Sequence, residues 1–215
     1  MSIRAIMAAR DDILAIATDL FTRHGFNGVS YADIARSLGM TTANIHYHFG
    51  TKLGLASAAL EAYADQVTER MRCIWCDEGS NLESKIKATI SFTQDSYNRF
   101  NGDGPPGRAW SLMSRFASDA DALDDDIRKR ITAFRSDAHA FVSRGVDIAM
   151  DAGEFRDDAP RAEMARILSS AFLYAPHIAR DTGGFAGAIR NYAAVHNMMR
   201  AAYGVQSRPS RRAKR

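Results

Sequence analysis

The sequence predicts an all-α protein with about nine helices. Apolar residues recur at helical spacing along the chain, and Ala, Leu, Met and Arg, which favour helices, are abundant. The sequence contains no β-branched runs that alternate with polar residues between turn signals. A chain of 215 residues can bury roughly 70% of its unfolded surface, so it needs neither disulfides nor a structural metal to fold.

The helices can be placed in order along the chain. The first is expected over residues 8–24, where Gly25 can end it in the left-handed conformation and Phe26 can pack back. Two short helices and a long one, 51–76, follow. Residues 101–107 include five glycines or prolines and predict a loop. Further helices are expected over 108–118, 123–152 with Gly153 as its cap, 160–177 with Pro160 in its first turn, and 185–203.

The segment 30–49 reads SYADIARSLGMTTANIHYHF. Ser30 and Asp33 have nearly the spacing of a capping box and begin a short helix. Ala35, Gly39 and Ile45 have the spacing of two helices that cross at a large angle, since the small residue permits close approach and the glycine permits the turn. Met40 fills the corner and Thr41 can cap the second helix. The segment therefore predicts a helix-turn-helix.

The second helix of this unit carries polar and aromatic side chains on its outer side. A helix of this kind fits the major groove of DNA with its N-terminal residues toward the base edges. Asparagine can read adenine, threonine and alanine can contact a thymine methyl group, and tyrosine and histidine can reach phosphates. The outward residues are Thr42, Ala43, Asn44, His46, Tyr47 and His48.

The stretch GMTTANIHYHFGTKLGL resembles the DNA-binding motif of the TetR family of regulators. In that motif the recognition helix ends in an aromatic and histidine cluster followed by a lysine. The resemblance covers about residues 13–60, and two positions depart from the pattern. His46 stands where tyrosine is usual, and Leu53-Gly54 replaces an acidic pair. The resemblance implies DNA contacts from Ser30, Tyr31, Thr41, Thr42, Asn44, His46, Tyr47, His48 and Lys52.

The same resemblance implies a division of the chain. Residues 1–52 are expected to form the helix-turn-helix DNA-binding domain, and residues 53–204 a helical effector-binding and dimerisation domain. Residues 205–215 are predicted to be a disordered basic tail. The tail carries five of the positive charges, and the remainder of the chain has a net charge of −2. The tail either contacts the DNA backbone or keeps the protein soluble.

Two sets of residues are candidates for the second domain, and core packing is the alternative role for each. A mostly apolar pocket with a few polar groups is the usual small-molecule site. The candidate pocket residues are Tyr63, Met71, Phe92, Tyr97, Trp110, Met113, Phe116, Phe134, His139 and Phe172, with Phe141 and His177 as further possibilities. The candidate dimer residues on the last two helices are Ala171, Phe172, Ala175, Ala193, Met198 and Ala201.

Two other motifs have competing interpretations. Cys73 and Cys76 are either a redox switch or incidental free thiols, and no further cysteine or histidine pair completes a metal site. An acidic group precedes a long helix. Stabilisation of the helix N-terminus by these negative charges is a better interpretation than a cation site. This group is Asp119, Asp121, Asp124, Asp125 and Asp126. No metal and no cofactor are expected.

Three functions are compatible with the sequence. The first is a dimeric repressor that reads the major groove of a palindromic DNA operator with residues 41–48 and is released by an unknown small-molecule effector. The second keeps the DNA-binding domain and replaces the effector with the thiol pair. The third is an all-α enzyme or an interaction protein; the sequence shows no nucleophile with an evident base and no phosphate loop. The chain lacks a membrane span and a signal peptide, so a cytoplasmic location is expected. The protein is not expected to be an enzyme. A homodimer that reads two half-sites is expected.

Overall fold

In a computed structural model, the described part of the chain forms ten α-helices and one short 3-10 helix. The structure describes residues 3–102 and 107–205, with side chains from Met7 onward. Within these ranges there is no strand, only an isolated bridge between Phe155 and Gly204. The prediction of an all-α fold is confirmed.

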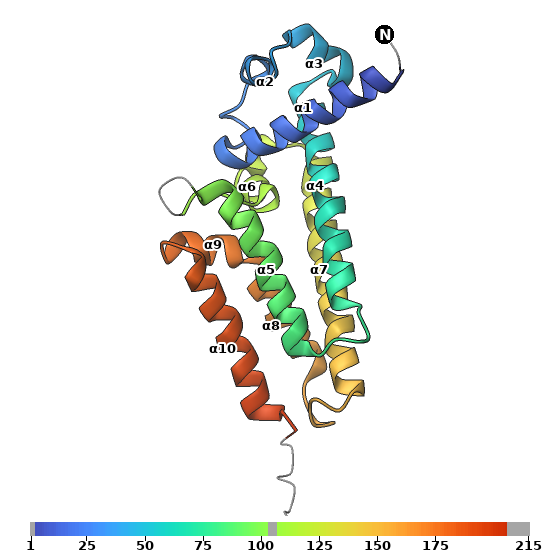
Figure 1. Cartoon of the computed structure of the whole chain (residues 1–215), viewed down its shortest axis with the longest axis vertical. Helices are drawn as coiled ribbons and strands as arrows, with labels where there is room; N and C mark the ends of the chain where they lie inside the picture. The colour runs from blue at the N-terminus through green and yellow to red at the C-terminus, as the bar shows by residue number, and fades with distance from the viewer. Residues whose placement is uncertain (1–2, 103–106, 206–215) are drawn as a thin grey trace, which may run out of the picture.

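The first three helices form one end of an elongated molecule (Figure 1). They are α1 (Ile3–His24), α2 (Tyr31–Leu38) and α3 (Thr42–Phe49). We call this unit the head. α1 packs across the upper end of α4 (Lys52–Trp75), α2 packs against α1, and α3 packs against α2 and α4. α4 therefore runs from the head into the rest of the molecule, which we call the body.

The body is a bundle of long helices. It contains α4, α5 (Leu82–Asn101), α7 (Asp125–Asp151), α8 (Arg161–Leu173) and α10 (Phe185–Tyr203). α7 packs between α4 and α8, and α10 packs against α8 and α5. Two short helices, α6 (Leu112–Ser118) and α9 (Ala175–Asp181), and the 3-10 helix η1 (Ala120–Ala122) lie near the head end of this bundle (Figure 1). α6 contacts α1, α4 and α7, so it lies between head and body.

Several predicted helix ends agree with the structure. α10 has the predicted bounds, and α1 ends where Gly25 adopts φ +75°. Gly153 follows α7 with φ +72°. The expectation for residues 8–24 is too short at its start, since α1 already begins at Ile3. Asn81 begins α5, where its side chain accepts from the N–H of Ser84 at 2.8 Å.

The single helix predicted over 160–177 is wrong. The structure has two helices there, because α8 ends at Leu173 and α9 begins at Ala175. Pro176 lies in the first turn of α9 rather than near the end of a helix. Proline lacks the N–H that an interior helical position needs, whereas the first turn does not use it. Pro176 is therefore a start signal for α9.

The helix predicted over 108–118 is shorter than expected. α6 begins at Leu112 because Ser111 is its N-cap, with its hydroxyl accepting from the N–H of Ser114 at 3.3 Å. Of the predicted loop 101–107, residues 103–106 lie outside the described part of the chain, as do residues 206–215 of the predicted tail. No helix in the described ranges is both long and apolar enough to cross a membrane.

Candidate nucleic-acid interface and ligand cavity

The start of α2 is fixed by a complete capping box. The backbone N–H of Ser30 donates to Asp33 Oδ2 at 2.9 Å, and the N–H of Asp33 donates to the Ser30 hydroxyl at 3.2 Å. The hydrogen bonds from the Ser30 side chain and backbone hold the pKa of Asp33 below its usual value. This confirms the capping box predicted from the spacing of the two residues.

The turn between α2 and α3 has the predicted geometry. Gly39 adopts φ +63°, a left-handed conformation that a side-chain-bearing residue enters at a cost of roughly 1–2 kcal/mol. Ala35 and Ile45 are buried where the two helices meet, and Met40 packs against the same core. The expectation for Thr41 is wrong in one respect. It is the N-cap of α3, but its side chain makes no capping hydrogen bond.

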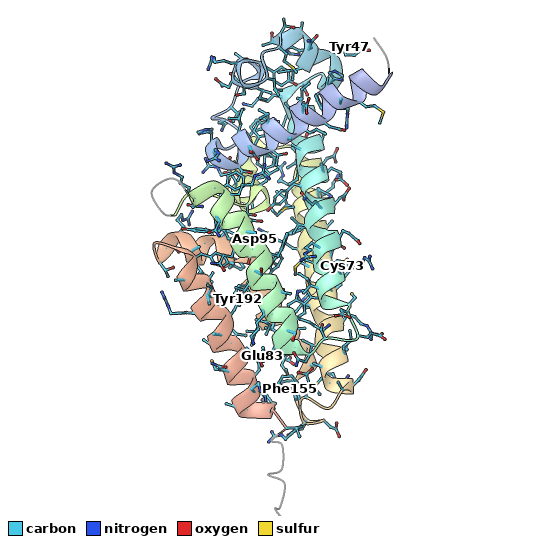
Figure 2. The ribbon with its side chains drawn as sticks, in the orientation of Figure 1. Tyr47, Cys73, Glu83, Asp95, Phe155 and Tyr192 are labelled. Atoms are coloured by element: carbon cyan, nitrogen blue, oxygen red, sulfur yellow. The ribbon has the colours of Figure 1, made fainter. Side chains whose placement is uncertain are left out.

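The outer side of α3 is open to solvent. Thr42, Asn44 and His46 are exposed, as is Thr41 just before the helix. The Tyr47 side chain is 76% exposed and projects from the outer end of the head (Figure 2). α3 is thus a short, well-anchored helix with a free polar and aromatic face.

Three of the predicted contact residues are held by neighbours within the head. His46 Nδ1 lies 2.8 Å from the carbonyl oxygen of Gly50, and its ring lies 4.5 Å from that of Tyr31, centroid to centroid. Tyr31 is half-buried, and this burial raises the pKa of its hydroxyl. The ring of His48 is half-buried and lies 5.2 Å from that of Tyr47. These contacts orient the rings before any partner is bound.

A hollow of about 460 Å³ opens beside α2 and α3. The Lys52 ammonium lies 4.3 Å from the centroid of the Phe26 ring, which fixes the position of its positive charge. Partial burial lowers the pKa of Lys52. The ammonium of Lys52 and the imidazole of His46 can contact a phosphate group, whereas the N-terminus of α2 already holds the Asp33 carboxylate. Its lining residues are Asn27, Gly28, Val29, Ser30, Tyr31, Asp33, His46 and Lys52.

The first turn of α4 is stabilised without an acidic pair. The hydroxyl of Thr51 accepts from the backbone N–H of Gly54 at 3.0 Å and caps the helix. Leu53-Gly54 therefore leaves this helix start intact, because the cap comes from the residue before Lys52.

The junction between head and body is formed by one side of α6. Asp119 Oδ2 accepts from the backbone N–H of Phe26 at 2.9 Å, and the Arg115 guanidinium donates to the carbonyl oxygen of His24 at 3.2 Å. Phe116 is fully buried with its ring edge toward Phe21, at a centroid distance of 5.6 Å. Nothing in the local sequence pattern marks these residues as a junction, because their partners lie about 90 positions away.

Gly25 completes this junction. Its φ of +75° favours glycine, and a Cβ atom there would lie 2.5 Å from Asp119 Oδ2 and 2.6 Å from the Arg115 guanidinium. The end of α1 is thus pressed directly against the side chains of α6.

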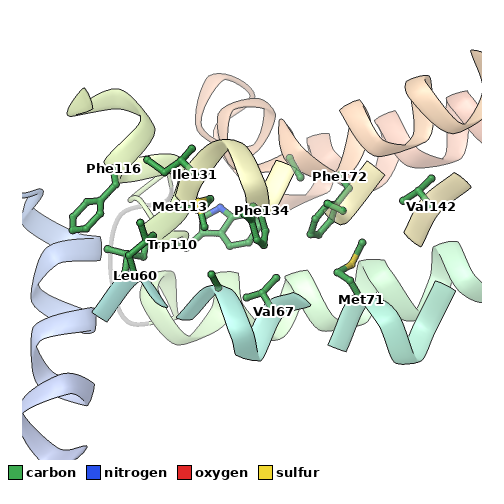
Figure 3. Packing of buried hydrophobic residues seen from close by; sticks show 14 of the residues in the cluster. Leu60, Val67, Met71, Trp110, Met113, Phe116, Ile131, Phe134, Val142 and Phe172 are labelled. Atoms are coloured by element: carbon green, nitrogen blue, oxygen red, sulfur yellow. The ribbon is translucent and has the colours of Figure 1, made fainter. Parts of the chain in front are cut away.

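The other side of α6 borders an apolar cavity of about 60 Å³ inside the body. Six of the ten candidate pocket residues line it: Tyr63, Phe92, Trp110, Met113, Phe134 and Phe172. Trp110, Met113 and Phe134 lie close together between α4 and α7 (Figure 3). The Tyr63 hydroxyl donates to the Ser111 hydroxyl at 3.2 Å, and burial raises the pKa of Tyr63.

The other four candidates do not line this cavity. Phe116 faces α1, and Met71 is fully buried further along α4 (Figure 3). Tyr97 packs against Trp110 and Phe185. His139 is exposed and lies 3.1 Å from the Ser169 hydroxyl. His177, by contrast, borders the cavity.

Comparisons with known proteins identify the head. The model of the bacterial regulatory proteins of the tetR family matches residues 13–59, which run from α1 to the first two turns of α4. Residues 13–59 are therefore similar to the helix-turn-helix segment of TetR-family regulators. The match covers the helix-turn-helix described above, together with the helices that support it.

The chain is also similar to a curated protein and to solved structures. It is 32% identical over 78 residues to the HTH-type transcriptional repressor ComR of Escherichia coli (strain K12), and this match spans 36% of the chain and 37% of ComR. A TetR transcriptional regulator from Chloroflexus aurantiacus has a TM-score of 0.77 at 20% identity, covering 95% of this chain and all of that one. A SmeT–triclosan complex has a TM-score of 0.69 at 21% identity, covering 97% and 98%. The two structures share the fold.

The candidate dimer residues fall into two groups. Ala171, Phe172 and Ala175 are buried within the chain's own core, so they are not available to a partner. Ala193, Met198 and Ala201 on α10 are exposed, and Met198 is 72% exposed.

Exposed apolar side chains missed by the sequence analysis lie on α8 and at its end. Ile167 is 51% exposed and Tyr174, the C-cap of α8, is 57% exposed. Burial in three dimensions, rather than helical spacing, separates these residues from their buried neighbours.

The two remaining motifs are the acidic group before α7 and the thiol pair. Asp124 caps α7 by accepting from the N–H of Ile127 at 2.9 Å, and Asp126 pairs with Lys129 at 3.1 Å. The described residues contain no group of three His, Cys, Asp or Glu side chains arranged for a metal ion. Cys73 and Cys76 are free thiols, exposed and half-buried respectively.

Proposed function

We propose that this protein is a dimeric transcriptional regulator that reads a palindromic DNA operator with α3 and is released from it by a small molecule. The observation that carries the proposal is the exposed polar face of α3, held by the capped α2 and the glycine turn. Such a helix enters the major groove with its N-terminal residues toward the bases. The name of ComR, a repressor, supports negative regulation for this chain as well.

Contacts with DNA divide into two kinds. Asn44 is exposed near the start of α3, where it can read the edge of an adenine. Ser30, Tyr31, His46 and Lys52 surround the hollow beside α3, which we assign to a backbone phosphate. Thr41, Thr42, Tyr47 and His48 complete the contact surface. The residues 1–52 form the reading domain in this proposal, and 53–204 the regulatory domain.

Two subunits are proposed to pair through α8 and α10. The two helices contact each other, and both leave apolar side chains uncovered, notably Ile167 and Met198. Ala194 and Ala201 lie on the same face of α10 as Met198, since residues three and four apart are neighbours on a helix. An apolar surface of this kind marks an interface. A two-fold dimer through these helices would place two reading helices on two half-sites.

Release by a ligand is proposed to act through α6. Ser111, Met113 and Ser114 on α6 border the apolar cavity, and Arg115 and Asp119 hold the end of α1. A ligand that widens the cavity would shift α6 and with it the head. The bound ligand would stabilise a second arrangement of the dimer, in which the two reading helices no longer match their half-sites. SmeT, a protein of the same fold, forms a complex with triclosan, which supports a small-molecule effector for this chain.

The two kinds of DNA contact predict different mutant behaviour. Asn44→Ala should cost about 1–3 kcal/mol at one base position and relax the sequence preference there. Lys52→Ala should weaken binding to all duplexes and lower the slope of log affinity against log salt by about one. Titrations of operator and scrambled duplexes at several salt concentrations measure both effects.

Arg70→Ala provides the control for this pair, because Arg70 is an exposed cation on α4 that does not line the hollow. It should change neither the preference nor the salt slope. Unchanged sequence preference in Asn44→Ala would contradict the assignment of Asn44 to a base.

A further inference from the structure

Two cavities adjoin at the head end of the body. One is the apolar cavity of about 60 Å³, and the other is a cleft of about 180 Å³ between α6 and α9. They share part of their walls, so these residues form the boundary between an apolar and a polar compartment. The shared residues are Trp110, Ser111, Ser114, Pro176 and His177.

The apolar compartment has polar atoms without partners at this boundary. Trp110 is 4% exposed, and its Nε1–H group is buried without a hydrogen-bond acceptor. His177 Nδ1 is likewise buried without a partner. A buried N–H group without an acceptor is destabilising, and a ligand that supplies an acceptor removes this penalty. The remaining walls are mostly aromatic or aliphatic, including Phe92, Phe134 and Phe172.

The polar compartment is basic. Arg108, Arg115 and Arg180 line the cleft together with His177, and its described lining contains no carboxylate. The apolar cavity also has no carboxylate in its lining, whereas Arg135 borders it. Two of the cleft arginines are paired with carboxylates outside the lining. Asp119 lies 3.6 Å from Arg115 Nε, and Asp181 lies 3.3 Å from Arg180 Nε. Guanidinium groups in this arrangement favour an oxyanion.

We propose that the effector is an amphipathic anion whose apolar part occupies the aromatic cavity and whose carboxylate or phosphate head lies in the arginine cleft. The Trp110 N–H and His177 meet its polar end at the boundary. The cavity is far smaller than the ~300–1,000 Å³ of typical ligand pockets, so a bound apolar part must widen it. This assignment rests on the ligand-released regulator proposed above.

Arg115 gives the anion a route to the head. The same guanidinium lines the cleft and donates to the carbonyl oxygen of His24 at the end of α1. An anion in the cleft competes with the His24 carbonyl oxygen for that guanidinium, because a hydrogen bond between two ionised groups is stronger than one to a neutral carbonyl. The head then loses one of its contacts with α6 when the effector binds.

Isothermal titration of the full chain with a matched set of octyl compounds tests the assignment. The probes are octanoate, octyl phosphate, octanol and octyltrimethylammonium, with acetate as an anion that lacks the apolar part. An octyl anion should bind roughly tenfold to a hundredfold more tightly than octanol, and the cation and acetate should bind more weakly still. The preference between octanoate and octyl phosphate identifies the head group. If octanol or the cation binds as tightly as both anions, or if neither anion binds at millimolar concentration, the assignment is wrong.

Variants locate the anion in the cleft. Arg180→Gln removes an exposed cleft guanidinium and should weaken the preferred anion roughly tenfold, while leaving octanol binding unchanged. Arg70→Gln removes an exposed guanidinium outside both cavities and should have no effect. Trp110→Phe keeps an aromatic side chain but removes the indole N–H together with part of the ring, and should also weaken the anion. Equal affinities in Arg180→Gln and the wild type would place the head group elsewhere and overturn the assignment.

DNA binding separates this inference from the function on which it rests. If the chain selects a specific duplex but binds neither anion, the regulator stands and the effector assignment fails. If the anion binds through Arg180 but no duplex is selected, the ligand site stands and the regulator fails. If both hold, the anion should release the duplex from the wild type, and Arg180→Gln should require roughly tenfold more anion for the same release.

Discussion

Met198→Glu is expected to leave the chain folded but monomeric. The side chain is 72% exposed on α10, so a carboxylate there costs little in the single chain. In a two-fold interface it would face apolar surface and lie near its own symmetry copy, and it would be desolvated without a partner. Since two linked reading heads bind about 10²–10⁴ times more tightly than one, affinity for a two-half-site operator should fall by at least roughly a hundredfold.

Analytical ultracentrifugation and operator titration measure the two consequences. Ala133→Glu, an exposed alanine on α7 given the same charge, is the matched control and should remain dimeric. A dimeric Met198→Glu with wild-type affinity would show that the pairing surface is not on α10.

Phe116→Ala should be among the most destabilising substitutions in the chain. The ring is fully buried between α6 and α1, with its edge toward Phe21. Removing a buried phenyl group leaves a cavity and typically costs about 3–5 kcal/mol. Urea denaturation followed by circular dichroism gives the change in the free energy of unfolding.

Phe155→Ala is the matched control for the function of this contact. Phe155 is equally buried, with 3% exposure, but it lies at the end of the body farthest from the head (Figure 2). Both variants should lose comparable stability. At temperatures where both remain folded, only Phe116→Ala should alter operator affinity or its response to a ligand. Equal effects of the two variants on DNA binding would contradict the coupling through α6.

The helix-turn-helix could be predicted because its determinants are local. The capping box of Ser30 and Asp33 and the left-handed Gly39 lie within ten residues of each other, and each has one dominant structural role. The small Ala35 and the aliphatic Ile45 then fix how the two helices cross. Thr41 is the exception, because its position fits a cap and its side chain does not form one.

The cavity and the dimer surface could be predicted only in part, since they depend on how distant helices pack. Aromatic residues on α4 to α8 were sensible candidates, but spacing along one helix does not distinguish Phe134, which lines the cavity, from Phe116, which faces the head. In the same way Phe172 is buried in its own chain, whereas Ile167 on the same helix is exposed.

The head–body junction and the arginine cleft were missed for the same physical reason. Arg115 and Asp119 have the spacing of an ordinary helical ion pair, and their partners His24 and Phe26 lie far away in the sequence. The sequence indicates that Gly25 ends α1, and the structure agrees. Its second role, direct contact with α6, appears only when the two helices are brought together.

Selection of the purified full chain on random-sequence duplexes, followed by sequencing of the retained DNA, tests most directly whether α3 reads an operator. We expect an enriched near-palindrome whose half-sites lie about one helical turn apart, roughly 10 base pairs centre to centre. Asn44→Ala, run in parallel, should lose preference at one symmetric pair of positions. Retention without any enriched sequence, abolished by moderate salt, would contradict the central claim that α3 reads an operator.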